Sequence, residues 1–225
     1  MRAGAARRRS SALVLGILAG AGAGDRLGAQ VPKAFVPCGG RELWEWSADA
    51  LASACDRIVF AVPAGMVDLD ADPPRIAGGA SRSESVRNAL ATIPAADIVV
   101  IHDAARPLVT ADLVQRCVEA VWAGADGAVA AAPVTDTIKQ ADADGRVERT
   151  LDRATLWSIQ TPQAFRGEIL RRALDVDDAT LAAATDDASL VEAAGGSVQI
   201  VEAPPGNFKV THPDDVLRAE STLAD

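Results

Sequence analysis

The sequence predicts a single-domain α/β fold with a doubly wound, mostly parallel sheet and a protruding β-hairpin arm. Three observations support this prediction. Apolar strand-like segments alternate with amphipathic helical segments, which is the pattern of βα units in a parallel sheet. The segments at 97–101 and 128–132 are apolar runs, as expected of strands buried on both faces. The chain has 225 residues, 49% of them hydrophobic, which suits one domain with a core of ordinary size.

Strands and helices alternate through the first part of the chain. A buried strand at 12–18 leads into a loop at 19–33, and a helix near 42–54 follows. The apolar residues of that helix recur at helical spacing, so we expect one inward face made of Leu43, Trp46, Ala50, Leu51 and Ala54. The next predicted elements are a strand at 57–62, a loop that contains Pro73 and Pro74 and reaches Gly78-Gly79, a helix near 83–92, the strand at 97–101, a helix at 111–123 and the strand at 128–132.

The segment at 134–162 is longer and more polar than its neighbours. Asp144-Gly145 within it is a hairpin-turn signal, and the segment lacks the Gly/Ser-rich or Pro-rich composition of a linker. We therefore expect a protruding arm at 134–162. The remaining predicted elements are helices near 166–174 and 185–194, a strand at 197–202 and a final helix that starts near Pro213, a residue suited to the first helical turn.

The first 24 residues admit two interpretations. A basic start, a short apolar stretch and a tail of small residues imitate an export signal, which would make the protein an exported, non-catalytic ligand-binding domain. The alternative is that 12–18 is the first strand of the sheet. The apolar stretch is short and interrupted by Gly16, and no other segment supplies an opening strand. We expect residues 1–11 to be a mobile basic tail, residues 12–225 to form the single domain, and the protein to be cytoplasmic.

Composition and charge argue against several functional classes. The net charge is −9, and the excess of acidic residues lies after the first 30 positions, so nucleic acid and anionic membranes are not expected partners. No apolar run is long enough for a membrane span. The three cysteines are widely spaced and there are only two histidines, which disfavours a disulfide framework, a structural zinc site and a Ser-His-Asp triad.

The loop after the first strand is rich in glycine and alanine. Small residues at 20–24 let backbone N–H groups approach an anion closely. The glycine spacing does not fit a dinucleotide fingerprint, Pro32 prevents a helix directly after the loop, and no Gly-Lys-Ser/Thr follows for a Walker loop. Two cations, Arg26 and Lys33, accompany the loop, which suits a polyphosphate; the alternative is a solvated turn with ordinary charges.

Two further features place charged residues at strand ends. Only three of the 22 basic residues are lysines, namely Lys33, Lys139 and Lys209. Two of them, Lys33 and Lys209, follow loops or strand ends, which suggests that lysine itself is wanted there. Asp103 directly follows the buried strand at 97–101, where ligands bind in doubly wound sheets. A turn or helix cap is the structural alternative for Asp103. His102 is expected to be a packed, hydrogen-bonded residue rather than a ligand.

Short motifs along the chain occur together in the order found in one known family. They are Gly22-x-Gly24-x-Arg26-Leu27, Pro32-Lys33, Gly78-Gly79-x-x-Arg82-x-x-Ser85-Val86, His102-Asp103-Ala104-Ala105-Arg106-Pro107, Pro133-Val134-x-Asp136-Thr137-Ile138-Lys139, Asp152-Arg153, Gln160-Thr161-Pro162-Gln163, Thr185-Asp186-Asp187-Ala188-Ser189 and Phe208-Lys209-Val210-Thr211. Over about residues 12–224, the chain resembles the 2-C-methyl-D-erythritol 4-phosphate cytidylyltransferase family of the non-mevalonate isoprenoid pathway.

This resemblance implies a Rossmann-like, nucleotidyltransferase-type fold and a reaction of CTP with the polyol phosphate, with Mg²⁺ as cofactor. The implied catalytic residues are Arg26, Lys33 and Lys209. The implied nucleotide-binding residues are Gly20, Ala21, Gly22, Ala23, Gly24, Gly79, Ser85 and Asp103, and Asp103 would also help to hold the metal. The implied substrate-binding residues are Arg106, Thr137, Arg153, Thr161, Thr185 and Asp186.

The resemblance also implies a homodimer that forms through the arm at 134–162, from which Thr137 and Arg153 would reach the sugar phosphate. The sequence departs from the family pattern at a few positions. Asp25 stands where a cation is common, Ala80 where some members have an acid, and Asp187 where Glu is common. None of these changes removes a residue implied to take part in the chemistry.

The expected nucleophile is a phosphate oxygen, which is largely ionised at neutral pH and needs no general base. This agrees with the scarcity of histidine. Two alternatives stay open. One is a cytidylyltransferase for another polyol phosphate, such as ribitol 5-phosphate. The other is a nicotinamide-dependent oxidoreductase, against which count the glycine spacing, Pro32 and the absence of tyrosine.

Overall fold

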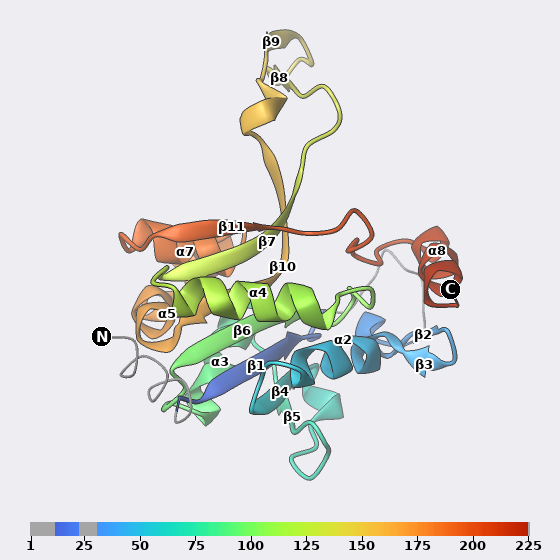
Figure 1. The fold of residues 1–225 in the computed structure, drawn as a ribbon, viewed down its shortest axis with the longest axis vertical. Helices are drawn as coiled ribbons and strands as arrows, with labels where there is room; N and C mark the ends of the chain where they lie inside the picture. Colours follow the sequence, from blue (N-terminus) through green and yellow to red (C-terminus); the bar gives the residue numbers. More distant parts are fainter. Residues whose placement is uncertain (1–11, 23–30, 225) are drawn as a thin grey trace.

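The computed structural model describes residues 12–22 and 31–224, and the predicted tail at 1–11 lies outside them. A sheet of seven strands forms the centre of the molecule (Figure 1). In sheet order the strands are β11 (Val198–Glu202), β7 (Gly127–Pro133), β10 (Trp157–Arg166), β6 (Ile98–Asp103), β1 (Val14–Ala19), β4 (Arg57–Val62) and β5 (Arg75–Ala77).

One strand of this sheet is reversed. Neighbouring strands are parallel except around β10, which is antiparallel to both β6 and β7. The carboxyl ends of β1, β4 and β6 meet at one edge, because Leu18 pairs with Phe60 on one side and with His102 on the other. Since β10 runs the opposite way, it is its first half that reaches this edge. The mostly parallel sheet confirms the predicted fold class.

Helices cover both faces of the sheet, which makes the fold doubly wound. One face carries α2 (Leu43–Ala52) and α4 (Ala111–Trp122), whose Leu51 and Leu113 join Val100 of β6 in one hydrophobic cluster. On the other face Leu170 joins Ile101 in a second cluster. Adjacent strand residues point to opposite faces, so β6 contributes to both clusters. The helices of this second face are α3 (Arg82–Thr92), α5 (Gly167–Leu174), α6 (Asp178–Ala183) and α7 (Asp187–Ala193).

A third, smaller cluster lies beside the edge of the sheet where β1, β4 and β6 end. It joins the short hairpin of β2 (Pro37–Cys38) and β3 (Arg41–Glu42) to α8 (Pro213–Leu223), with Val210 buried between them. Pro213 is the first residue of α8, as predicted. The backbone N–H of Val210 donates to the carbonyl of Ala105 at 2.8 Å. This bond fixes the segment that carries Lys209 against the loop after β6.

Between β7 and β10 the chain leaves the body as an arm (Figure 1). The strands β8 (Lys139–Ala141) and β9 (Val147–Thr150) pair antiparallel, and Gly145 in their turn has a positive φ of 78°. Every residue from 139 to 150 is exposed. The short helix η4 (Arg153–Thr155) precedes β10. The protruding hairpin matches the prediction made from the Asp144-Gly145 signal.

Several predicted elements need correction. The predicted arm at 134–162 overlaps β10, a strand of the central sheet that continues to Arg166. Polar residues and Pro162 interrupt the apolar pattern there, so the periodicity gives no strand signal. The strand β5 and the helix α6 were not expected, because three and six residues are too few to show a period. On α2 the buried tryptophan is Trp44, not Trp46, whose ring is partly exposed beneath Arg41.

Two short 3-10 helices, η2 (Lys33–Phe35) and η3 (Ala64–Met66), complete the described elements. In residues 12–22 and 31–224, no helix has the length and apolar character needed to cross a bilayer.

Candidate active site

Two adjoining cavities open where the parallel strands end. The first, of about 300 Å³, lies among the loop after β1, η2, the start of α3 and the loop after β6. The second, of about 450 Å³, is lined by residues of β10, α7 and the end of β6. Arg82, Asp103 and Lys209 line both cavities, so these side chains stand at their boundary. This sheet edge is where doubly wound folds bind their ligands.

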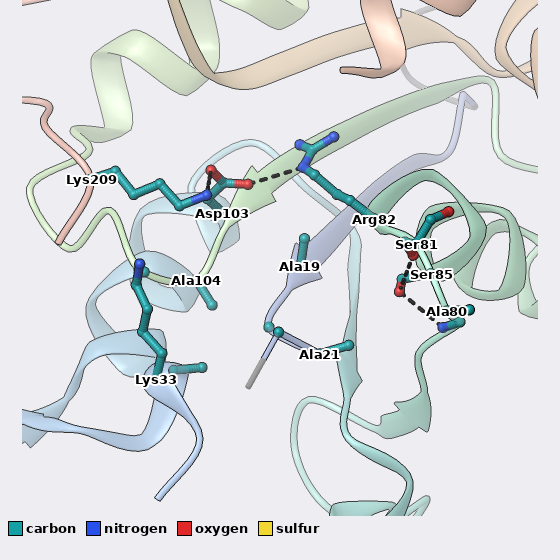
Figure 2. A pocket seen from close by; sticks show the side chains of 15 residues that line it. Ala19, Ala21, Lys33, Ala80, Ser81, Arg82, Ser85, Asp103, Ala104 and Lys209 are labelled. Atoms are coloured by element: carbon teal, nitrogen blue, oxygen red, sulfur yellow. Dashed lines mark hydrogen bonds and ion pairs between the residues drawn. The ribbon is translucent and has the colours of Figure 1, made fainter. Parts of the chain in front are cut away.

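The first cavity brings together residues that are far apart in the sequence. Gly20, Ala21 and Gly22 line one side of it, and Lys33 and Lys209 another. Figure 2 shows the side chain of Lys33 extending toward the ion pair between Lys209 and Asp103. The predicted Ala23, Gly24 and Arg26 lie outside the described residues.

The start of α3 forms the wall opposite Lys33 (Figure 2). Ser81 caps this helix, since its hydroxyl accepts the backbone N–H of Glu84 at 3.1 Å. The hydroxyl of Ser85 donates to the Ser81 carbonyl and accepts the N–H of Gly79, both at 2.9 Å. Ser85 therefore lines the cavity with its hydroxyl engaged in holding the loop at 79–81 in shape.

Asp103 is the centre of a cluster of charges. Its Oδ2 lies 2.8 Å from Lys209 Nζ and 3.7 Å from Arg106 Nε, and its Oδ1 lies 3.2 Å from Arg82 Nε. The backbone N–H of Asp103 donates to Thr161 Oγ1 at 3.0 Å. One carboxylate thus gathers three cations at the boundary of the two cavities. This local positive charge contrasts with the net charge of −9 of the whole chain.

The charges in this cluster are fixed. Burial alone would raise the pKa of Asp103, but the positive charges of Arg82 and Lys209 outweigh it and hold this pKa far below its usual range. Burial alone would lower the pKa of Arg82, and the carboxylates of Asp187 and Asp103 outweigh that effect and raise it. Both groups stay ionised near neutral pH, so they can orient and neutralise anions but do not exchange protons with them.

Four of the six predicted substrate-binding residues line the second cavity: Arg106, Thr161, Thr185 and Asp186. Contacts fix Arg106 and Asp186, in addition to Thr161, whose hydroxyl contacts Asp103. Arg106 Nη1 donates to the Asn207 carbonyl at 2.9 Å. Asp186 caps α7 by accepting the N–H of Ser189 at 2.9 Å, and its other oxygen accepts the Gln163 amide at 2.9 Å. The second cavity is therefore polar and held in shape by its own hydrogen bonds.

His102 lies behind the second cavity and is fully buried. Its Nδ1 is 3.0 Å from Thr161 Oγ1, and its Nε2 is 3.3 Å from the Arg106 carbonyl. Burial lowers the pKa of His102 to about 4, so the ring is neutral at physiological pH. These contacts agree with the expectation of a packed, hydrogen-bonded histidine.

The other two predicted substrate-binding residues, Thr137 and Arg153, do not reach these cavities within the chain. Both are exposed on the arm, and Arg153 Nη1 donates to the Thr135 carbonyl at 2.6 Å. The structure therefore separates the predicted site into a part on the body and a part on the arm.

Several residues of the site received no role in the sequence analysis. Arg82 is the most central of them, because it lines both cavities and pairs with both Asp103 and Asp187. Ligands bind beyond the carboxyl ends of parallel strands, and this rule points to Arg82 after β5 as it points to Asp103 after β6. The three residues of β5 show no strand pattern in the sequence, so the rule could not be applied there. Two others are Gln163 and Gln160 on β10, and the side chain of Gln160 accepts the amide of the neighbouring Asn207 at 2.8 Å.

The implied Mg²⁺ can be tested against the side chains of the site. Within the part of the chain that the structure describes, no group of three His, Cys, Asp or Glu side chains could hold a metal. Mg²⁺ is often held by one or two carboxylates together with substrate phosphates, and Asp103 fits that role as a single protein ligand. Both Asp103 oxygens already contact cations, so a bound ion would share them.

Comparisons with known proteins give one consistent result. The family model described as 2-C-methyl-D-erythritol 4-phosphate cytidylyltransferase matches residues 14–225. A protein of that name from Prochlorococcus marinus (strain MIT 9313) is 42% identical over 92% of this chain and 97% of its own length. The crystal structure of 2-C-methyl-D-erythritol 4-phosphate cytidylyltransferase from Thermus thermophilus matches with a TM-score of 0.79 and 33% identity, covering 93% of this chain and 98% of that one.

Some relatives are longer than this chain. The bifunctional enzyme IspD/IspF of Anaeromyxobacter dehalogenans (strain 2CP-C) is 45% identical over 93% of this chain, which spans 57% of that relative's length. The match of the family model covers nearly all the described residues. The chain belongs to the 2-C-methyl-D-erythritol 4-phosphate cytidylyltransferase family.

Proposed function

We propose that this protein joins CTP and 2-C-methyl-D-erythritol 4-phosphate to give 4-diphosphocytidyl-2-C-methyl-D-erythritol and pyrophosphate, a step of isoprenoid precursor biosynthesis. Membership of the family supports this activity. The single structural observation that carries it is the pair of adjoining cavities with Arg82, Asp103 and Lys209 at their boundary. Two anionic reactants can occupy neighbouring cavities only where positive groups offset their repulsion.

In this proposal CTP occupies the first cavity. The loop after β1 and Gly79 would lie against its phosphates, which suits small residues that allow a close approach. Lys33, Lys209 and Arg26 would neutralise the charge that develops as pyrophosphate leaves. Ser85 would stand beside the ribose or the base. The contacts of Lys33 and Lys209 with one cavity support this arrangement; Arg26 stays a prediction from the sequence.

The acceptor would occupy the second cavity, with its phosphate turned toward the boundary. Arg106, Thr161, Thr185 and Asp186 would contact its polyol or its phosphate. An oxygen of that phosphate forms a bond to the α-phosphorus of CTP, and the bond between this phosphorus and the pyrophosphate oxygen breaks. The phosphate dianion carries its own nucleophilic charge, so no side chain has to remove a proton. A neutral, buried His102 is consistent with such a mechanism.

We propose Mg²⁺ as the cofactor, held mainly by the phosphates of the nucleotide with Asp103 as its protein ligand. When bound, the ion would add positive charge to the phosphate oxygens. The side chains would still set the position of both substrates. Lys209 and Arg82 hold the Asp103 carboxylate in place, which keeps it available at the wall of the first cavity.

We further propose that the protein is a homodimer in which the arm at 134–162 of one subunit reaches the second cavity of the other. The exposed position of Thr137 and Arg153, away from the cavities of their own chain, supports this proposal. Arg153 would then hold the acceptor phosphate. We also propose a catalytic domain at 12–225, which the extent of the family match supports. A cytoplasmic location is proposed because CTP is supplied there.

The decisive experiment is an assay of pyrophosphate release in the presence of Mg²⁺. CTP with 2-C-methyl-D-erythritol 4-phosphate is expected to react, and CTP with ribitol 5-phosphate to react at least about 100-fold more slowly, a difference of about 2.7 kcal/mol. Equal rates with ribitol 5-phosphate would support the alternative acceptor. CTP at about 100 times its Kd should also stabilise the fold by about 2.7 kcal/mol. Stabilisation by NAD in place of CTP would point to the oxidoreductase alternative.

A further inference from the structure

Arg82 and Asp187 form an ion pair to which the proposed chemistry assigns no role. Arg82 is the first residue of α3 and Asp187 is the first residue of α7. Arg82 Nη1 donates to Asp187 Oδ2, and Arg82 Nε donates to Asp103 Oδ1 at 3.2 Å (Figure 2 shows the second contact). One guanidinium therefore joins the starts of two helices to the carboxylate at the boundary of the cavities.

This ion pair is not explained by stability. Asp187 is 0% exposed, and among the described residues its Oδ1 has no hydrogen-bond partner. A buried carboxylate with one unpartnered oxygen is destabilising, and an apolar residue of similar size often serves a core as well or better. The position of Asp187 is thus better explained by its effect on Arg82 than by its own contribution to the fold.

The contacts continue from Arg82 to Lys209. Arg82 engages Oδ1 of Asp103, which leaves Oδ2 turned to Lys209 at 2.8 Å. Lys209 has a long side chain that is 40% exposed, so its position depends on that carboxylate. The charges alternate from the buried Asp187 through Arg82 and Asp103 to Lys209, and the last three line both cavities.

We propose that Asp187 and Arg82 are positioning residues for the transfer reaction. Asp187 fixes Arg82, Arg82 fixes the rotation of Asp103, and Asp103 holds the Lys209 ammonium at the boundary where the two phosphates meet. This inference rests on the proposed function. A reacting group displaced by about 1 Å can lower the rate by about 100-fold, so an indirect role is sufficient for a large effect.

The test compares two variants, each of which weakens one link. Asp187→Asn keeps the size of the side chain and removes its charge, and Arg82→Lys keeps the charge but cannot engage both carboxylates at once. Each is expected to lower kcat by about 10- to 100-fold in the pyrophosphate assay. The KM for CTP should change less than about threefold, because Lys33 and the glycine-containing loop are untouched. The kcat of the double variant should be no lower than that of the single variants, since both substitutions act through Asp103.

A matched control is available at another arginine of the same helix, α3. Asp178 of α6 pairs with Arg87 of α3 at 2.7 Å, with its side chain 78% exposed, and lies outside both cavities. Asp178→Asn removes a carboxylate from an α3 arginine and should leave kcat within about twofold. Thermal melting and calorimetric titration with CTP are measured for every variant. Arg82→Lys retains the positive charge, so it provides the test if Asp187→Asn does not fold.

The outcomes separate the two proposals. Wild-type kcat in both Asp187→Asn and Arg82→Lys, with an active wild-type enzyme, overturns the positioning role and leaves the proposed function standing. A loss of kcat accompanied by an equal loss of CTP binding also overturns it, because that pattern indicates a disrupted nucleotide cavity. A wild-type protein that releases no pyrophosphate contradicts the proposed function and, with it, the positioning role.

Discussion

Lys33 and Lys209 come from segments more than 170 residues apart and line one cavity. Fixed cations of this kind stabilise the charge that develops on a departing pyrophosphate. Lys33→Ala is expected to lower kcat for pyrophosphate release by at least about 100-fold, which is the scale of losing one preorganised donor. The measurement is steady-state kinetics with CTP and 2-C-methyl-D-erythritol 4-phosphate.

The third lysine of the chain serves as the control for this prediction. Lys139 is exposed on the arm and donates to Thr150 Oγ1 at 2.6 Å. Lys139→Ala removes the same charge from the protein and should leave kcat within about threefold. If Lys33→Ala retained wild-type kcat, the assignment of Lys33 to the phosphates would be wrong.

His102 gives the fold a dependence on pH. In the unfolded chain this histidine has the ordinary pKa of 6.5, whereas burial lowers its pKa in the fold to about 4. The unfolded state therefore binds more protons between these values, so the free energy of unfolding should fall as the pH falls from about 6.5 to about 4. The contribution of this residue is on the order of 3 kcal/mol. Urea unfolding at several pH values measures it.

His102→Gln isolates this contribution. Glutamine can still bond Thr161 or the Arg106 carbonyl but does not titrate, so its stability curve should be flatter between about pH 6.5 and 4. Asp103 affects the free energy of unfolding only at lower pH. Its pKa in the fold lies far below the ordinary 3.8, so its stabilising contribution is lost as the pH falls below that value. An identical slope for wild type and His102→Gln between pH 6.5 and 4 would show that another group titrates there.

At the scale of elements, the first cavity depends on a close approach of two loops. A Cβ added at Gly78 would lie 2.3 Å from Ala21 Cβ and 2.9 Å from Ser85 Oγ. Gly78→Ala should therefore separate the loop after β1 from the start of α3 and raise the KM for CTP by about tenfold, which corresponds to about 1.4 kcal/mol of the 1–3 kcal/mol typical of overpacking. Gly65→Ala in η3 has open space around the added atom and is the matched control.

The elements also show where the sequence was informative. Long apolar strands such as β1, β4 and β6 carry a clear pattern, and the rule that ligands lie beyond strand ends then points to Asp103. The strand β10 carries no such pattern, because it crosses from the exposed arm into the core and its polar residues face a cavity. Without β10 and β5, neither Gln163 nor Arg82 could be assigned to the site from the sequence.

At the scale of the whole molecule, the family resemblance predicted the fold class, and it named site residues on the body and on the arm that local patterns did not connect. Periodicity is a property of a segment, whereas the cluster around Asp103 is assembled from β6, α3, α7 and the segment before α8. A pattern within one segment does not predict contacts among residues of four segments. The position of the arm relative to a second subunit stays a prediction, since it depends on a contact between chains.

Subunit mixing tests whether two chains share one site. Lys33→Ala would inactivate the body part of the site and Arg153→Ala the arm part, mainly by raising the KM for the sugar phosphate. If each site uses the arm of the other subunit, a mixed dimer contains one site in which both parts are intact. When equal amounts of the two variants are mixed and their subunits exchange fully, half of the dimers are mixed dimers. The mixture should therefore show about a quarter of wild-type activity at low acceptor concentration.

Sedimentation of the mixture confirms the assembly, and the wild-type protein mixed with buffer alone sets the scale of activity. Activity no higher than the sum of the two single variants would argue for a site completed within one chain. In that case the arm would need another role, since Arg153 lies outside both cavities of its own chain.

The reversed strand β10 has a consequence for how acceptor preference could evolve. Gln163 lines the second cavity from a position that pairs with Ile101 of β6 and with Val129 of β7, and Gln160 and Thr161 precede it in a short irregularity of the same strand. This wall of the cavity is therefore held between two strands of the sheet and is not a surface loop. In most doubly wound enzymes, insertions in connecting loops diversify the ligand. Here, recruitment of a differently shaped alcohol would depend on point substitutions in a rigid interior strand, which favours a narrow and slowly changing choice of acceptor.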